Sequence, residues 1–433
     1  MLRKIFSRIK RYIPLKIQKI FVGSIFISFG KIVVTFLILY LLSNSTDGVL
    51  TSYGNYQNIV TILMAFIGLS VQNGITTYTA RANINSTQSN LGPHLLTIFI
   101  VGLTVVSLMA VLVDLYDLKN IATFIGLSEG RFKFFMLVAI SFLGVVQSYY
   151  CAVLIGKGFV LQGQALDLLK NFLLLFLIGS YIFLHKELSI ISIMFFSALI
   201  IVPFLIRNLT LNSNYYFKPK LDSTTIEIAK PGIVTMYSGV LVASATIFVR
   251  NIAIDYGGYG LSDLFEIIIR IKVMYHLVVS APLALILLRS YASADTNKTF
   301  RLASKAFPVM VIPILGLALV PSELLQFLLS IVFNKELEDF KLVLLLLIGA
   351  ETVRAIGLFF HGFLVSKAII LPQLLFATLA QIIIIVTVVK FASAETFIVH
   401  YFVGYLLSQI IWLSLNYIYV RSLNNKNSIL TNS

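Results

Sequence analysis

Charged side chains lie inside long apolar stretches of this sequence, where a charge is energetically costly. Lys31 lies near the middle of the run GSIFISFGKIVVTFLILYLL. A charge at the centre of a bilayer costs at least about 2.5 to 3.5 kcal/mol on insertion scales. Ser24, Ser28 and Thr35 stand at helical spacing from Lys31, so all four side chains fall on one stripe of a helix whose other surface is apolar. The pattern predicts that Lys31 faces protein or water rather than lipid.

Other embedded charges come in pairs or stand alone. Glu266 and Arg270 are four residues apart, and Glu351 and Arg354 are three apart, so each pair can be neutralised within its own helix. Arg250, like the lysine above, has no acidic residue within one helical turn. We expect such a cation either to pair with a residue on another helix or to bind an anion.

Taken together, the embedded set is more positive than negative, which favours a water-filled cavity with an anionic ligand. Asn73 could contact substrate, or it could form a hydrogen bond between helices instead. The same alternative applies to its neighbour Gln72. His276 and His361 are too isolated to indicate a metal site, and we expect neither a metal ion nor a cofactor. The candidate substrate-binding residues are Lys31, Arg250, Arg270, Lys272, Arg354, Asn73 and Ser28, and the candidate ion-coupling residues are Glu266 and Glu351.

The elements that carry these residues are long apolar runs. The chain has 433 residues, 58% of them hydrophobic and 12% charged, whereas soluble globular proteins carry about 25% charged residues. Each run is long enough to cross a bilayer. We predict an all-α polytopic membrane protein of about 12 transmembrane helices, at residues 20–43, 58–79, 93–115, 134–156, 164–184, 188–206, 231–250, 264–288, 306–332, 342–366, 369–390 and 398–420.

The longest internal connection separates six predicted helices from six others, which indicates two bundles. The net charge of +15 is concentrated in alternate connections, as the positive-inside rule requires, so it indicates topology rather than nucleic-acid binding, and both termini are expected to face the cytoplasm. The expected parts are a basic amphipathic segment at 1–19 lying on membrane lipid headgroups, a six-helix bundle at 20–209, a cytoplasmic linker at 210–230, a six-helix bundle at 231–420 and a cytoplasmic tail at 421–433.

The motifs of common enzymes are missing. The sequence has no GxxxxGK[ST] loop, no HExxH and no GxSxG. The longest predicted outside loop, from Tyr116 to Lys133, offers few groups for an active site. We therefore expect a protein that is not an enzyme, with a membrane-embedded polymerase as the alternative from that class.

Several stretches resemble the Wzx polysaccharide flippases. DGVLTSYGNYQ and GLSVQNGITTYTAR are similar to the turn before the second helix of that family and to the segment after it. LIGKGFVLQGQALDLLKN and FNKELEDFKLVLLLLIGAETVRAIGLFFHGFLVSKAII resemble segments of its O-antigen and enterobacterial common antigen branch. In that branch, charged residues are expected at the positions of Lys31, Lys157, Arg250, Glu351 with Arg354, and Lys367.

This resemblance implies the fold of the multidrug/oligosaccharidyl-lipid/polysaccharide (MOP) exporter superfamily, in which two six-helix bundles surround a central cavity. It implies a bacterial inner-membrane flippase that moves oligosaccharide repeat units on undecaprenyl diphosphate to the periplasmic leaflet by alternating access. The polymerase and chain-length regulator of the same pathway are the implied protein partners. Two alternatives stay open within the superfamily, another lipid-linked precursor flippase and an ion-coupled exporter.

Overall fold

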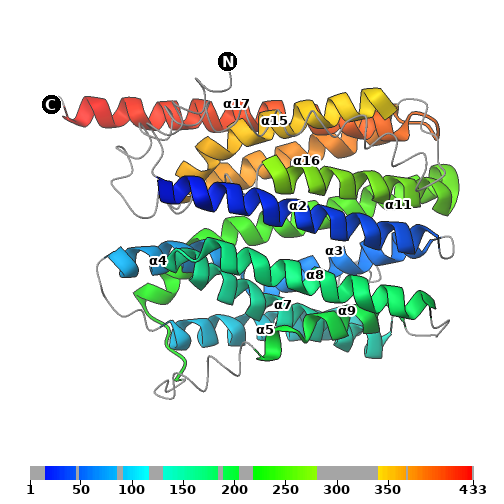
Figure 1. The fold of residues 1–433 in the computed structure, drawn as a ribbon. Coiled ribbons are helices and arrows are strands. Elements are labelled where there is room, and N and C mark those ends of the chain that lie inside the picture. The colour runs from blue at the N-terminus through cyan, green and yellow to red at the C-terminus, as the bar shows by residue number, and fades with distance from the viewer. Residues whose placement is uncertain are drawn as a thin grey trace. The chain divides into compact units, whose positions relative to one another are not determined.

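The computed structural model of the chain consists of α-helices wherever it describes regular elements (Figure 1). It describes residues 15–44, 48–84, 91–116, 130–183, 189–203, 218–279, 340–366 and 369–431. The helices in these ranges are α2 (Leu15–Ser43), α3 (Val49–Ile67), α4 (Gln72–Ile84), α5 (Gly92–Leu115), α7 (Arg131–Lys157), α8 (Val160–Phe183), α9 (Ile190–Ala198), α11 (Ser223–Val279), α15 (Phe340–Ser366), α16 (Leu371–Phe391) and α17 (Phe397–Thr431).

Most of these helices can cross a membrane. Among the described residues, 8 helices are long and apolar enough, or up to 9 if the bent pair α3 and α4 forms one span. Large apolar side chains such as Phe26 and Phe176 are 72% and 69% exposed, which suits a surface solvated by lipid rather than by water. The all-α polytopic prediction is confirmed. The predicted span at 306–332, Lys367 and residues 1–14 of the predicted amphipathic segment lie outside the described residues.

The predicted span at 58–79 is not one straight helix. α3 and α4 meet at an angle of 51° across residues 68–71. Leu69 and Ser70 adopt left-handed backbone angles, with φ of 45° and 46°, which are unusual for residues with a side chain. The Tyr149 hydroxyl donates to the Gly68 carbonyl at 2.6 Å, so a side chain of α7 satisfies a carbonyl that the break releases from the helix.

α11 reverses its direction. Its 57 residues would span about 85 Å in a straight helix, nearly three times the hydrocarbon thickness of a bilayer. Arg250 and Glu266, 16 residues apart, would lie about 24 Å apart along such a helix, yet their side chains form a hydrogen bond. Gly258, midway between them, has φ of 68°, which glycine adopts without strain. The predicted span at 231–250 and residues 264–279 of the next predicted span thus lie on the two arms of α11, and the connection predicted between these spans is helical instead.

The chain forms two compact units. Unit 1 comprises Met1–Ile32, Asp255–Gly257 and Ile267–Ser433, and unit 2 comprises Val33–Ile254 and Gly258–Glu266. In unit 2, α7 packs against α3, α4, α8 and α9, and in unit 1, α17 packs against α15 and α16. The predicted linker at 210–230 stays a prediction, because residues 204–217 lie outside the described part of the chain.

Candidate functional site

A tyrosine at the centre of unit 1 holds an acid and a base together. α15 supplies Glu351 and Arg354, which share one face because they are three residues apart, and α17 supplies Tyr405. The Tyr405 hydroxyl donates to Oε1 of Glu351 at 2.5 Å and accepts from Nη1 of Arg354 at 3.0 Å. Nη1 of Arg354 also lies 3.7 Å from Oε1 of Glu351. The predicted proximity of this acid and base is confirmed, with the hydroxyl bridging them.

A second cation reaches the same tyrosine from α11. Nζ of Lys272 donates to the Tyr401 hydroxyl at 2.9 Å. It lies 4.5 Å from the ring centroid of Tyr405 and 5.4 Å from that of Tyr401, within the range of cation–π attraction. The two rings are nearly parallel because the tyrosines are four residues apart on one helix. Lys272 and Arg354 therefore both contact Tyr405, one at its ring and the other at its hydroxyl.

The cations of this cluster are more accessible than its acid. The Arg354 side chain is 32% exposed and Lys272 is half-buried, whereas Glu351 is 1% exposed. Nδ1 of His276 lies 3.4 Å from Oε2 of Glu351. Lys272 and Arg354 carry two positive charges, and Glu351 carries one negative charge. Since a guanidinium has five N–H donors, such a cluster can bind an anion with the donors that Tyr405 and Glu351 do not use.

The residues described so far, Glu351, Arg354, Tyr405, Tyr401, Lys272 and His276, form the Tyr405 cluster. Arg250 does not form part of the Tyr405 cluster. It is fully buried in unit 2, where Nη2 donates to Oε2 of Glu266 and Nη1 donates to Oδ1 of Asn55. The side chains of Arg250 and Glu266 are 1% and 0% exposed. Arg250 therefore has an ion-pair partner far outside one helical turn, because the reversal of α11 brings Glu266 to it. Its contact with substrate stays a prediction. The role of Glu266 in ion coupling stays a prediction.

Two further contacts fix α3 against the second arm of α11. A Cβ added at Gly54 would overlap the carboxylate of Glu266, so only glycine leaves room for the ion pair. Asp263 accepts from the backbone N–H of Gly48 and of Thr51, both at 2.9 Å, and from the Thr51 hydroxyl at 2.6 Å. Asp263 thus caps the N-terminus of α3 from a different helix, a role that the sequence did not indicate.

The remaining candidates lie on α2, α4 and α11. Lys31 and Ser28 are 8% and 3% exposed, so the predicted inward direction of their stripe on α2 is confirmed. Asn73 donates to the Thr235 hydroxyl at 3.1 Å, as the hydrogen-bond alternative predicted. Arg270 is half-buried in unit 1. The contact of Lys31 or Asn73 with substrate stays a prediction.

Sequence reasoning missed Tyr401 and Tyr405. Both lie in the apolar run of α17, where tyrosine is common as an ordinary packing residue. The available signal was their spacing of four residues, which places two hydroxyls on one helix face. The partner helix could not be read from that spacing.

No family model and no curated protein matches the sequence. Solved structures with the same fold do exist. An outward-facing multidrug resistance MATE family transporter of the MOP superfamily has 14% identity and a TM-score of 0.67, covering 95% of this chain and 96% of that chain. A mutant of the Vibrio cholerae MATE transporter VcmN has 14% identity and a TM-score of 0.69, covering 97% and 98%.

A third solved structure is a MOP superfamily transporter from Pyrococcus furiosus, for which a reversed polarity of the binding pocket suggests a different function. It has 14% identity and a TM-score of 0.69, covering 94% of this chain and 96% of that chain. At these identities the likeness concerns the fold and not the substrate. The chain therefore has the fold of the MATE transporters of the MOP superfamily.

Proposed function

We propose that this protein is a flippase that moves an oligosaccharide repeat unit linked to undecaprenyl diphosphate from the cytoplasmic to the periplasmic leaflet by alternating access. The observation that carries this proposal is the pair of half-buried cations, Lys272 and Arg354, which both contact Tyr405 beside the buried acid Glu351. A diphosphate is the part of such a cargo that needs cations, and charge-assisted hydrogen bonds from a fixed arginine suit it.

Transport of this cargo needs a polar path. Removing each sugar hydroxyl from water without a new hydrogen bond costs roughly 2 to 7 kcal/mol, so several sugars cannot cross bare lipid. A protein of this fold with half-buried cations offers such a path, while the polyprenyl tail stays in the lipid. Outward movement of the diphosphate is also favoured by a cytoplasm-negative potential, by about 2.3 kcal/mol per charge per 100 mV.

The resemblance to Wzx flippases supports the same cargo and the same location. It supports a location in the bacterial inner membrane and the polymerase and chain-length regulator of the pathway as partners. The distribution of positive charge supports cytoplasmic termini. The polymerase reading is less favoured, because the solved structures of the same fold are transporters.

An ion-coupled exporter of drugs is the second candidate, because the solved structures include multidrug transporters. Drug antiporters usually carry cations, which require an excess of acid around the ligand. The Tyr405 cluster has the opposite balance, with Lys272 and Arg354 against Glu351. The reversed pocket polarity described for the Pyrococcus furiosus transporter supports the view that this fold accepts ligands of either sign.

The test is complementation of a strain that lacks the gene. We expect the deletion to abolish polymerised surface glycan and to leave lipid-linked single units on the cytoplasmic side, where a reagent added to spheroplasts cannot reach them. Lys272→Met and Arg354→Met should fail to restore export at normal membrane abundance. Lys390→Met and Arg421→Met are matched controls, since both side chains are exposed in unit 1, and they should restore it.

Each outcome separates the candidates. Accumulation of single units on the periplasmic side would indicate a polymerase instead. Normal export by both Lys272→Met and Arg354→Met would overturn the proposal. Resistance to cationic drugs that falls on deletion, with surface glycan intact, would favour the exporter.

A further inference from the structure

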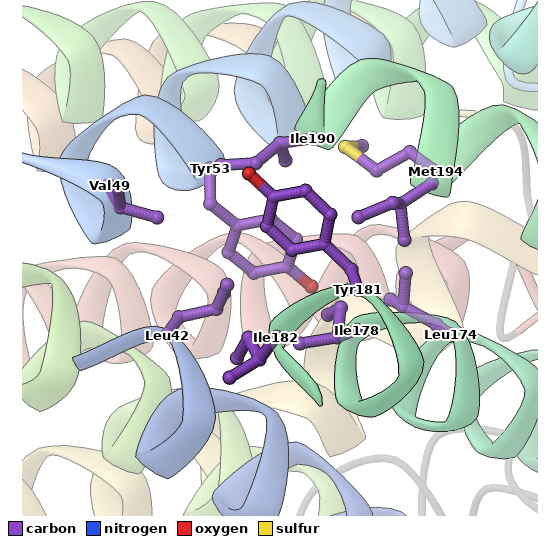
Figure 2. Close-up of a pocket in the computed structure, with 10 residues that line it drawn as sticks. Leu42, Val49, Tyr53, Leu174, Ile178, Tyr181, Ile182, Ile190 and Met194 are labelled. Carbon is purple, nitrogen blue, oxygen red and sulfur yellow. The ribbon is translucent and has the colours of Figure 1, made fainter. Parts of the chain in front are cut away.

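Unit 2 encloses an apolar cavity of about 160 Å³ that the anion chemistry of the Tyr405 cluster does not use (Figure 2). Four helices contribute to it, with the C-terminal parts of α2 and α8 facing the first turns of α3 and α9. The residues that line it are Leu42, Val49, Tyr53, Leu174, Ile178, Tyr181, Ile182, Ile190, Ile193 and Met194.

The walls of this cavity exclude a charged group. None of its lining residues is charged, and the only polar atoms on their side chains are the hydroxyls of two tyrosines (Figure 2). An apolar cavity of about this size stays dry and binds a benzene-sized group. A five-carbon isoprenoid unit is close to that size, and its methyl branch fills a short, wide space better than a straight acyl chain does.

Burial of the lining residues indicates where the cavity opens. Ile178 and Ile193 are 2% and 4% exposed, so the inner end is closed. Four lining residues are half-buried. Val49 is the first residue of α3, Tyr181 and Ile182 are near the last residue of α8, and Ile190 is the first residue of α9. Within the described part of unit 2, the mouth is therefore at the helix ends, from where a chain can insert its tip.

Hydrocarbon is available next to this mouth. On the outer side of α8, Phe172 and Phe176 are 50% and 69% exposed, as expected of a lipid-facing surface. Under the predicted topology, α2 and α8 both end at the periplasmic side, so the mouth opens to the leaflet that receives the cargo.

We propose that this cavity binds one isoprenoid unit of the polyprenyl chain, on the periplasmic side of the membrane. The identity of the chain rests on the function proposed above, whereas the size and apolar walls of the cavity do not. Binding there holds the tail of the cargo beside unit 2.

The test uses the purified full-length chain with undecaprenyl phosphate or phosphatidylglycerol as probe, with bound lipid counted by native mass spectrometry. Ile193→Trp fills the cavity and should lower undecaprenyl phosphate binding by about tenfold, with phosphatidylglycerol binding unchanged. Phe176→Trp adds the same ring on the lipid-facing side of α8 and should leave both unchanged. Equal loss of both lipids in Ile193→Trp, or no loss of either, would overturn the proposal.

A labelling experiment avoids the risk that a filled variant does not fold. A polyprenyl phosphate with a photoreactive group at the tail end should label wild-type peptides from residues 174–182 and 190–194. Labelling confined to other helices would contradict the proposal. The two proposals fail separately, because intact export in Lys272→Met and Arg354→Met refutes the flippase mechanism while tail binding to purified protein can still be measured.

Discussion

Arg250 and Glu266 form a buried ion pair within a single helix, although 16 residues separate them. The pair exists because α11 turns back at Gly258 and brings its two arms side by side. Asn55 of α3 is uncharged and accepts a second hydrogen bond from the guanidinium of Arg250. The two arms of α11 and the helix α3 therefore meet at this arginine. The pair therefore fixes the reversal of α11 against α3.

Removal of one partner should be far more damaging than removal of both. Arg250→Leu or Glu266→Leu leaves a charge buried without its partner, which typically costs 3 to 5 kcal/mol. The double variant removes both charges and should recover a large part of that loss. The measurement is the thermal unfolding midpoint of detergent-purified protein at equal concentration.

The exposed pair Arg81 and Glu227 offers a matched control for this prediction. Its side chains are 47% and 59% exposed, and such pairs contribute about 0 to 1 kcal/mol. Arg81→Leu should therefore shift the midpoint only slightly. A double variant of the buried pair that is as unstable as the sum of its single variants would contradict the argument.

Gly54→Ala tests the close approach beside the same pair. The new Cβ would overlap the Glu266 carboxylate, and the fully buried carboxylate has little room to move. We expect a loss of folded protein in fluorescence-detected size-exclusion chromatography. Gly239→Ala is the control, because nothing lies within 4 Å of its added Cβ and alanine favours a helix by up to about 1 kcal/mol.

The sequence predicted the directions of side chains better than their partners. Helical periodicity was enough to place Lys31 and Ser28 on a buried stripe, because residues three and four apart share a face of any α-helix. The partner of Arg250 depended on the reversal at Gly258, and periodicity carries no information about a contact between two helix arms.

The break between α3 and α4 could not be predicted from the sequence for a related reason. Hydropathy reports that residues 58–79 are apolar enough to span, and it is insensitive to a change of backbone angle at Leu69 and Ser70. The Tyr149 hydroxyl that stabilises the break comes from α7. Only the packing of three elements decides whether such a span stays straight.

Asp222 gives a test of pH dependence outside the membrane-spanning segments. The backbone N–H of Thr225, supported by Lys220 and His94, lowers the pKa of Asp222 from 3.8 to about 2. A lowered pKa means that the charged carboxylate stabilises the folded state above pH 3.8, and that this contribution is lost as the pH falls through about 2. Asp222 precedes the first residue of α11, so the charge also favours the helix N-terminus.

Asp222→Asn keeps an acceptor oxygen for Thr225 but removes the charge. The difference in unfolding midpoint between wild type and this variant should be constant above pH 3.8 and should shrink as the pH is lowered toward 2. Thermal unfolding in detergent over this range is the measurement. A difference that persists unchanged at the acid end would show that the charge of Asp222 does not stabilise this helix start.

Tyr405→Phe tests whether the hydroxyl positions Arg354 for an anion. The change removes the donor to Glu351 and the acceptor for Arg354, while the ring that Lys272 contacts is retained. Hydrogen bonds to charged groups contribute about 1.5 to 3 kcal/mol, so the affinity for a polyprenyl diphosphate should fall by about ten- to a hundredfold. Native mass spectrometry measures the affinity, and complementation measures export.

Two other tyrosines of α17 provide comparisons for the Tyr405→Phe variant. Tyr417 is 46% exposed, and Tyr417→Phe should leave affinity and export unchanged. Tyr401→Phe removes the hydroxyl that accepts from Lys272 but leaves the Tyr405 hydroxyl in place, so its effect should fall between the two. Because phenylalanine preserves the volume at each site, similar membrane abundance is expected in all three variants. Equal affinities in all three would mean that packing, rather than the Tyr405 hydroxyl, sets the position of the Arg354 guanidinium.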